Sequence, residues 1–250
     1  MNFFLYSIFL FFIGIECGIL SWKENQHLKT YCGTKPGLLH QSSTRRSMRS
    51  ASKLSACSAS HDIYNFNGNN WVFTQNNNLF YVTNQKDELI SEQVSKIILF
   101  NYCYRADVNY DDMMIWELKE DIRLNDFAQP ACISNNPSLQ ATYTNVRLTS
   151  YGHNNTNFDN TDRKGIYMLR KGDFVIESLA NMGRAFTIVD QHQKYSVRPG
   201  DSGGSVINDV NGRHYVIGVA SRAIGSDPFR AEIASVYAHF NQICQYTGVC

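Results

Sequence analysis

From His61 onward, short apolar runs alternate with clusters of turn residues. The turn clusters, rich in asparagine, lie at 65–70, 76–78, 135–137 and 154–160. Aromatic and β-branched side chains, which favour strands, dominate the apolar runs Trp71–Phe73, Leu79–Val82, Ile97–Phe100, Gly165–Leu169, Asp173–Ile176 and Tyr215–Val219. Many short strands with frequent turns predict an all-β barrel or sandwich. A terminal helix is expected from about Ala231 to Tyr246, although its capping signals are weak.

Length and charge narrow the class of protein further. The 250 residues, of which 43% are hydrophobic, suffice for one substantial domain or for two small domains that share a core. The formal net charge of +1 provides no basic surface of the kind that nucleic-acid binding requires. We therefore predict no nucleic-acid partner.

The N-terminus carries a targeting pattern. Residues 3–15 form an apolar run too short to span a bilayer comfortably, and small residues such as Gly18 and Ser21 follow it. This pattern is typical of a secretory signal peptide over residues 1–21. A signal anchor is the alternative, because no basic residue precedes the run. No second run of membrane length follows, so we predict a soluble, secreted, extracellular protein without stable membrane association.

Residues 22–55 are polar and basic, with Arg46 and Arg49 in a basic cluster. Their sequence has little periodicity for a packed helix or strand, so we interpret them as a pro-segment or linker. The remaining residues, 56–250, would form the folded domain.

Cysteine usage agrees with an oxidising compartment. Cys17 would leave with the signal peptide, and the six other cysteines are an even number, which favours three disulfides. No Cys-X-X-Cys pair or cysteine–histidine cluster indicates a metal site. Asn154 begins a sequon for N-glycosylation, as expected on a surface loop of a secreted chain.

The string Gly200-Asp201-Ser202-Gly203-Gly204 indicates chemistry. Glycines on both sides of a serine allow a sharp turn and close approach of a substrate. In such a turn, the amides of Gly200 and Ser202 can point together at an oxyanion that develops on the substrate. Ser202 is therefore a candidate nucleophile for acyl transfer, whereas a glycine-rich surface turn is the simpler alternative.

Pro199–Ser205 resembles the nucleophile segment of the trypsin/chymotrypsin serine endopeptidases, and the resemblance covers residues 90–240 well. The stretches 24–33 and 242–250 are similar to a nematode-expanded subgroup of secreted trypsin-like proteins. The resemblance implies two perpendicular six-stranded antiparallel β-barrels that divide near residues 130–140. The stretch between the basic cluster and His61 is shorter than in the family, so an incomplete N-terminal barrel is the alternative, with a gene-model product or splice form as its source.

The same resemblance implies a catalytic triad. Asp112, directly before the apolar run 113–118, matches the family's aspartate, with Asp111 as the alternative. Ala59-Ser60-His61 resembles the segment that carries the general base, although Asp62 replaces the family's cysteine. A loop histidine without catalytic role is the alternative for His61. Ser202 would then attack a peptide carbonyl while His61 accepts its proton and Asp112 orients the imidazole.

Positions that match the family's activation and substrate-binding residues predict how the protein is activated and what it cleaves. In the family, cleavage after a basic residue frees an amine that pairs with the acid at Asp201; Arg46 or Arg49 would be the cleavage site. Ser196 matches the base of the primary specificity pocket, where a neutral hydroxyl predicts apolar or small residues before the scissile bond. Ser221 and Ala223 match the strand that pairs with extended substrate, with Arg222 and Ala223 replacing an aromatic residue and a glycine.

Cys32 and Cys132 resemble the bridge that tethers the pro-segment to the body. Elimination then leaves Cys244–Cys250 and Cys57–Cys103, although six cysteines permit many other pairings. The leading hypothesis is a secreted serine endopeptidase that acts on proteins or peptides, is activated by another protease and needs no metal or organic cofactor. The alternative is a catalytically inactive homologue that binds proteins or peptides through the same cleft.

Overall fold

The computed structural model describes residues 20–34, 64–67, 70–73, 78–82, 89–100, 112–118, 130–150, 152, 170–198 and 200–250. The elements before the barrel are helix α1 (Trp22–Tyr31) and strands β1 (Tyr64–Asn67), β2 (Asn70–Phe73), β3 (Asn78–Val82), β4 (Leu89–Leu99) and β5 (Met114–Leu118). A 3₁₀ turn, η2 (Pro137–Gln140), then leads into the barrel.

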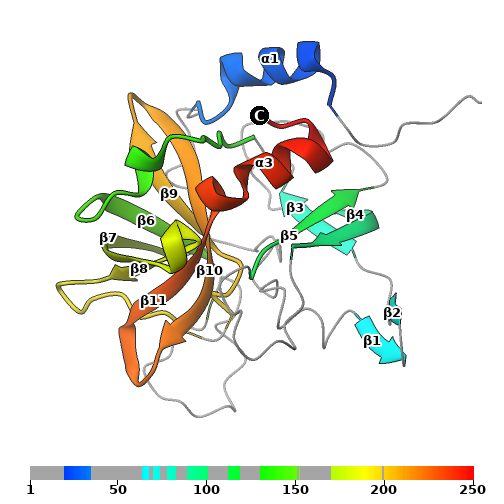
Figure 1. The fold of residues 1–250 in the computed structure, drawn as a ribbon. Coiled ribbons are helices and arrows are strands. Elements are labelled where there is room, and N and C mark those ends of the chain that lie inside the picture. Colours follow the sequence, from blue (N-terminus) through cyan, green and yellow to red (C-terminus); the bar gives the residue numbers. More distant parts are fainter. Residues whose placement is uncertain are drawn as a thin grey trace, which may run out of the picture.

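A closed antiparallel barrel forms the C-terminal half of the molecule (Figure 1). Its strands are β6 (Asn145–Ser150), β7 (Arg170–Ala180), β8 (Ala185–Val189), β9 (Ser205–Val210), β10 (Arg213–Ile224) and β11 (Asp227–Ser235), with the 3₁₀ turn η4 (Asn181–Gly183) between β7 and β8. They close in the order β10-β11-β8-β7-β6-β9. The predicted all-β fold with a six-stranded antiparallel barrel is therefore confirmed for this half.

Alternate side chains along the barrel strands point inward and form the core. Burial in β6 alternates with a period of two, as expected for a strand with one face inward. The large apolar side chains at 0% exposure are Ile176, Phe186, Ile188, Val206 and Ile233. Burial of each such side chain contributes about 1.5–3 kcal/mol to folding.

The strands before the barrel form two smaller sheets. β1 pairs with β2, and β3, β4 and β5 form a three-stranded antiparallel sheet. Within the described ranges these strands do not close into a second barrel. The predicted runs Trp71–Phe73 and Leu79–Val82 lie in strands, whereas Asn65–Asn70, predicted as turn, supplies parts of β1 and β2. The turn prediction is therefore wrong at 65–67 and 70, where pairing between β1 and β2 outweighs the turn preference of asparagine, while residues 68–69 lie outside the described ranges.

Further predicted runs also lie in strands: Ile97–Leu99 in β4, Asp173–Ile176 in β7 and Tyr215–Val219 in β10. The run Gly165–Leu169 lies outside the described residues. A second apolar cluster connects the segment before β5 to the barrel: Met113, Ala234 and Val236 are buried together, and Phe100, Val219 and Ile243 pack against them. This contact positions residue 112 beside strand β10.

Helix α1 overturns the expectation that the segment from residue 22 has little regular structure. Ser21 and Glu24 form a capping box, in which the Ser21 hydroxyl accepts from the Glu24 amide and the Glu24 carboxylate accepts from the Ser21 amide. At the other end, the Arg213 guanidinium donates to the carbonyls of Lys29 (2.7 Å) and Thr30 (3.0 Å). Local capping and a distant arginine thus stabilise a helix that lacks an apolar stripe.

A disulfide and backbone bonds hold α1 to the body. Cys32 and Cys132 are bonded, the pair that the family resemblance implies. The Cys250 amide donates to the Asn25 side chain, and the Leu20 amide donates to the Thr247 carbonyl. The two ends of the described chain therefore lie together, with α1 beside α3 in Figure 1.

The C-terminal helix α3 spans Val236–Thr247, so the predicted start at Ala231 is wrong. Residues 231–235 continue strand β11 instead, where they pair with β8. The helix is capped more firmly than its sequence indicated: the Ser235 hydroxyl accepts from the Ala238 amide, and Gly248 ends the helix with φ +74°. Cys244 and Cys250 form a second disulfide. None of the helices among the described residues is long and apolar enough to cross a bilayer.

Candidate functional site

Ser202 lies in a tight turn directly before β9. Gly200 and Gly203 adopt φ values of +95° and +81°, which side chains with a Cβ rarely tolerate. The Gly203 amide donates to the Ala220 carbonyl (2.6 Å), and the Gly204 amide donates to the Asp201 carbonyl (2.9 Å). The glycines therefore do what the sequence indicated: they fold the chain sharply and anchor it to β10.

Ser202 is connected to Asp112 through Ser221 of β10. The Ser202 hydroxyl donates to the Ser221 carbonyl at 2.9 Å. The Ser221 hydroxyl donates to an Asp112 carboxylate oxygen at 2.7 Å. Asp112 and Ser221 are both buried, with 5% and 8% exposure, so this hydrogen-bonded chain is shielded from water. Two predicted triad positions from remote segments thus meet at one place, with Ser221 between them.

The amides that the sequence assigns to an oxyanion hole lie in the same turn. Among the described residues, neither the Gly200 amide nor the Ser202 amide donates a hydrogen bond to another group. Two such donors close to a nucleophilic hydroxyl are what stabilisation of a tetrahedral oxyanion needs.

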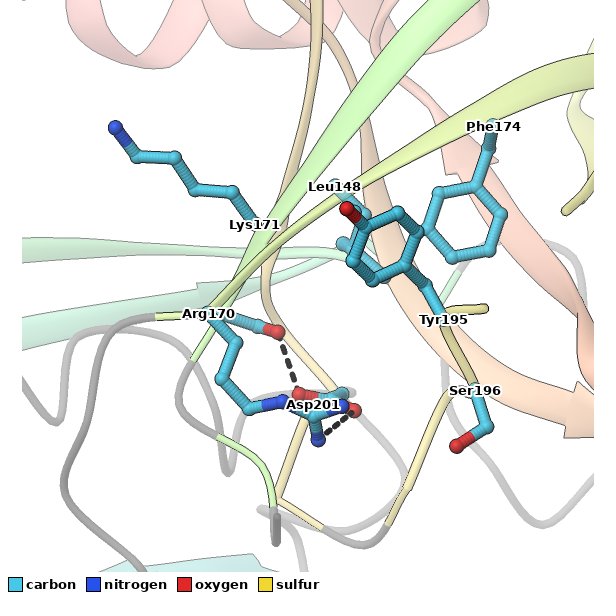
Figure 2. A pocket seen from close by; sticks show the side chains of 9 residues that line it. Leu148, Arg170, Lys171, Phe174, Tyr195, Ser196 and Asp201 are labelled. Atoms are coloured by element: carbon cyan, nitrogen blue, oxygen red, sulfur yellow. Dashed lines mark hydrogen bonds and ion pairs between the residues drawn. The ribbon is translucent and has the colours of Figure 1, made fainter. Parts of the chain in front are cut away.

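Asp201 has a buried carboxylate, 2% exposed, and its partners differ from those of Ser202. One of its oxygens accepts from the Ser150 hydroxyl (2.5 Å) and from the Gly152 amide (2.8 Å). The other accepts from the Arg198 amide (2.7 Å) and lies 3.9 Å from an Arg170 nitrogen. Figure 2 shows the Arg170 side chain reaching towards this carboxylate.

Gly152 is required for this arrangement. A Cβ at that position would lie 2.2 Å from an Asp201 carboxylate oxygen, which is a severe overlap. The sequence prediction missed Ser150, Gly152 and Arg170 as partners of Asp201. Ser150 was detectable, because the alternation of β6 places it on the inward face with Val146 and Leu148.

Ser196 lies next to Asp201 around a small cavity. The cavity of about 20 Å³ is lined by Ser150, Arg170, Tyr195, Ser196 and Asp201, among others (Figure 2). The half-buried Ser196 hydroxyl accepts from the Arg198 side chain at 2.7 Å. The position predicted as the base of a specificity pocket therefore carries a neutral hydroxyl with a guanidinium beside it.

The loop that leads to Ser196 is organised by Asp190. Burial raises the pKa of Asp190, but the amides of Tyr195, His192 and Lys194 outweigh burial and hold that pKa below its ordinary value. These amides donate to the carboxylate at 2.5–2.8 Å. One ionised side chain thus fixes the loop that precedes the Ser202 turn.

Ala223 and Arg222 lie on β10 after Ser221. Ala223 is half-buried and pairs with Ala231, while the exposed Arg222 forms an ion pair with Glu232 at 3.1 Å. The predicted residues His61, Arg46 and Asn154, and the alternative Asp111, lie outside the described residues. Among the described side chains, no group of three or more metal-ligating residues is close enough together to hold a metal ion.

A comparison with known proteins also indicates a trypsin-like family. A family model described as the nematode trypsin-6-like family matches residues 73–250. The match confirms the resemblance to a nematode trypsin-like subgroup. A search of curated proteins found no match.

Proposed function

Because the chain belongs to the nematode trypsin-6-like family, we propose that it is a serine endopeptidase that hydrolyses peptide bonds through an acyl-enzyme on Ser202. The family match covers the whole barrel and the segment that carries Asp112. Membership of a trypsin-like family supports a protease-related function. The arrangement of Ser202 and Asp112 supports the specific reaction proposed here.

The hydrogen-bonded chain from Ser202 through Ser221 to Asp112 is the observation that carries this proposal. It brings a hydroxyl in a glycine-rich turn next to a buried carboxylate more than 80 positions earlier in the sequence. A structural serine in a surface turn does not need this carboxylate, whereas a nucleophile whose base must be oriented does.

In the proposed reaction, the Ser202 oxygen forms a bond to the peptide carbonyl carbon while its proton passes to His61. The amides of Gly200 and Ser202 stabilise the oxyanion, and Asp112 stabilises the imidazolium. The C–N bond then breaks as His61 returns the proton to the leaving amine. Water, activated by the same histidine, hydrolyses the ester and restores Ser202.

Substrate preference follows from the pocket residues. Ser196 offers no negative charge to balance a lysine or arginine side chain, so we propose cleavage after small or apolar residues of proteins or peptides. Ala223 narrows the mouth of such a pocket. A peptide library cleaved mainly after arginine or lysine would contradict this assignment.

Labelling with a fluorophosphonate tests the hydrolytic function directly. The wild-type protein is expected to label, before or after trypsin treatment, and the Ser202→Ala variant is expected not to label. His61→Ala should slow labelling at least about 100-fold, since general-base catalysis contributes 10²–10⁴-fold. The exposed His192 provides a control, His192→Ala, that should leave labelling unchanged.

The second candidate is an inactive homologue that binds peptides through the same cleft. The short stretch between the basic cluster and His61 and the absence of a second closed barrel within the described ranges favour it. Failure of Ser202-dependent labelling in every state, together with saturable binding of peptides, would establish this function instead.

Secretion and glycosylation belong to the same proposal. The apolar run at 3–15 supports export through the secretory route, and Asn154 is the proposed glycan site. Expression in animal cells should release the protein into the medium, and Asn154→Gln should remove the mass of one glycan.

A further inference from the structure

Asp201 has a buried carboxylate that already accepts three hydrogen bonds from within the chain. A carboxylate offers about four positions for hydrogen bonds on its two oxygens. Ser150 and Gly152 donate to one oxygen, and the Arg198 amide donates to the other, beside which Arg170 lies. An ionised carboxylate that is removed from water needs such donors and an opposite charge. Arg170 provides the charge from within the chain.

This arrangement differs from activation by a new N-terminus. The family resemblance implies that an amine freed after Arg46 or Arg49 pairs with Asp201. Each cut would expose a serine, Ser47 or Ser50, which contributes little apolar surface to hold a chain end in a pocket. In the uncleaved chain the cavity next to Asp201 measures about 20 Å³, the size of about one water molecule.

We propose that Arg170 and Ser150 are positioning residues that hold Asp201, and with it the Ser202 turn, in the uncleaved chain. The inference rests on the proposed function of Ser202. Arg170 takes the part of the cationic partner, and Ser150 supplies a hydrogen bond from β6. Because Asp201 is the immediate neighbour of Ser202, a fixed carboxylate keeps the turn and its amides in place without proteolysis.

The test uses the full chain with Arg46→Gln and Arg49→Gln, so that cleavage in the basic cluster is blocked. Mass spectrometry verifies that the chain is intact, and the rate of fluorophosphonate labelling at Ser202 is measured. The intact chain is expected to label at the rate of the trypsin-treated wild type. Arg170→Gln and Ser150→Ala should each lower the rate about tenfold, while Arg170→Lys retains most of it.

Lys171→Gln is the matched control. This substitution removes the same charge from the adjacent position of β7. The Lys171 side chain is exposed, however, and points away from Asp201 in Figure 2. Its labelling rate should equal that of the parent chain. Equal rates for Arg170→Gln and Lys171→Gln would overturn the inference.

The pH profile separates the two cationic partners. An α-amine titrates ordinarily at about pH 7.7–8.0, and pairing with a carboxylate raises that value, so its charge is present at low pH and lost as pH rises through the raised pKa. A guanidinium stays charged throughout. The charged or titratable side chains around Asp201 in the described cavity are Arg170, Lys171 and Tyr195. Labelling of the parent chain should therefore stay constant from about pH 8 to 10, whereas dependence on an α-amine gives a loss in this range.

The outcomes distinguish this inference from the proposed function. Labelling that appears only after trypsin treatment overturns the inference and leaves the hydrolase intact. Absence of labelling in every state overturns the proposed hydrolytic function. Hydrogen exchange at residues 200–204 then tests whether Arg170 holds the Ser202 turn in place. Exchange should be faster in Arg170→Gln than in Lys171→Gln, and equal exchange would refute the role.

Discussion

At the scale of single residues, Ser221 connects the two chemical halves of the site. Its carbonyl accepts from Ser202 and its hydroxyl donates to Asp112, so one residue holds both the proposed nucleophile and a buried carboxylate. Removal of a hydrogen-bond donor from a buried carboxylate lowers the free energy of unfolding by more than an average hydrogen bond contributes, because no water replaces the lost donor.

We predict that Ser221→Ala lowers the free energy of unfolding by about 1–3 kcal/mol. The rate of fluorophosphonate labelling should fall about tenfold, since each 1.36 kcal/mol lost from the transition state costs a factor of ten. Chemical denaturation and labelling kinetics measure the two effects. The exposed Ser178 on β7 gives the control, Ser178→Ala, and equal labelling of both variants would show that the Ser221 hydroxyl has no positioning role.

At the scale of elements, helix α1 depends on the barrel for its C-terminal end. The last carbonyls of a helix lack partners within the helix, and Arg213 of β10 supplies donors to two of them together with a positive charge. The helix N-terminus, by contrast, is satisfied locally by Ser21 and Glu24. Neighbouring residues therefore cap the N-terminal end of α1, whereas a residue distant in sequence caps its C-terminal end.

Arg213→Gln should release the C-terminal turn of α1. We expect faster hydrogen exchange in residues 22–32 and a free energy of unfolding lower by about 1–3 kcal/mol. Arg147→Gln is the control, because Arg147 pairs with Asp173 and Asp209 at a solvent-exposed site where ion pairs contribute only about 0–1 kcal/mol. Unchanged exchange in α1 after the Arg213 substitution would contradict the capping role.

At the scale of the whole molecule, a disulfide spans the boundary between the N-terminal segment and the barrel. Cys32 and Cys132 are 100 positions apart, and the basic cluster at 45–49 lies between them. A cut in that cluster leaves the α1 segment covalently attached.

Limited trypsin treatment tests this attachment. After cleavage at Arg46 or Arg49, a non-reducing gel should show one species of unchanged mass, and a reducing gel should show two fragments. Cys32→Ser should release the fragment without reductant. Two fragments from the wild type under non-reducing conditions would mean that the bridge does not form.

The sequence by itself determined the features that depend on neighbouring residues. The glycines around Ser202 predicted a sharp turn because only glycine adopts such φ values readily, and apolar runs predicted strands β2, β3, β4, β7 and β10. The capping box at Ser21 was also visible in the sequence, although the general polarity of that segment obscured it.

Tertiary structure alone decided which distant groups meet. Ser221 reaches Asp112 across 109 positions and Ser150 reaches Asp201 across 51, and no local pattern specifies such partners. Strand register and barrel closure set these contacts, because β9, which follows the Ser202 turn, pairs with β10 on one side and with β6 on the other. A buried carboxylate needs a partner that the fold supplies, and in the uncleaved chain Arg170 lies 3.9 Å from Asp201. Pairing of Asp201 with a new N-terminus stays a prediction.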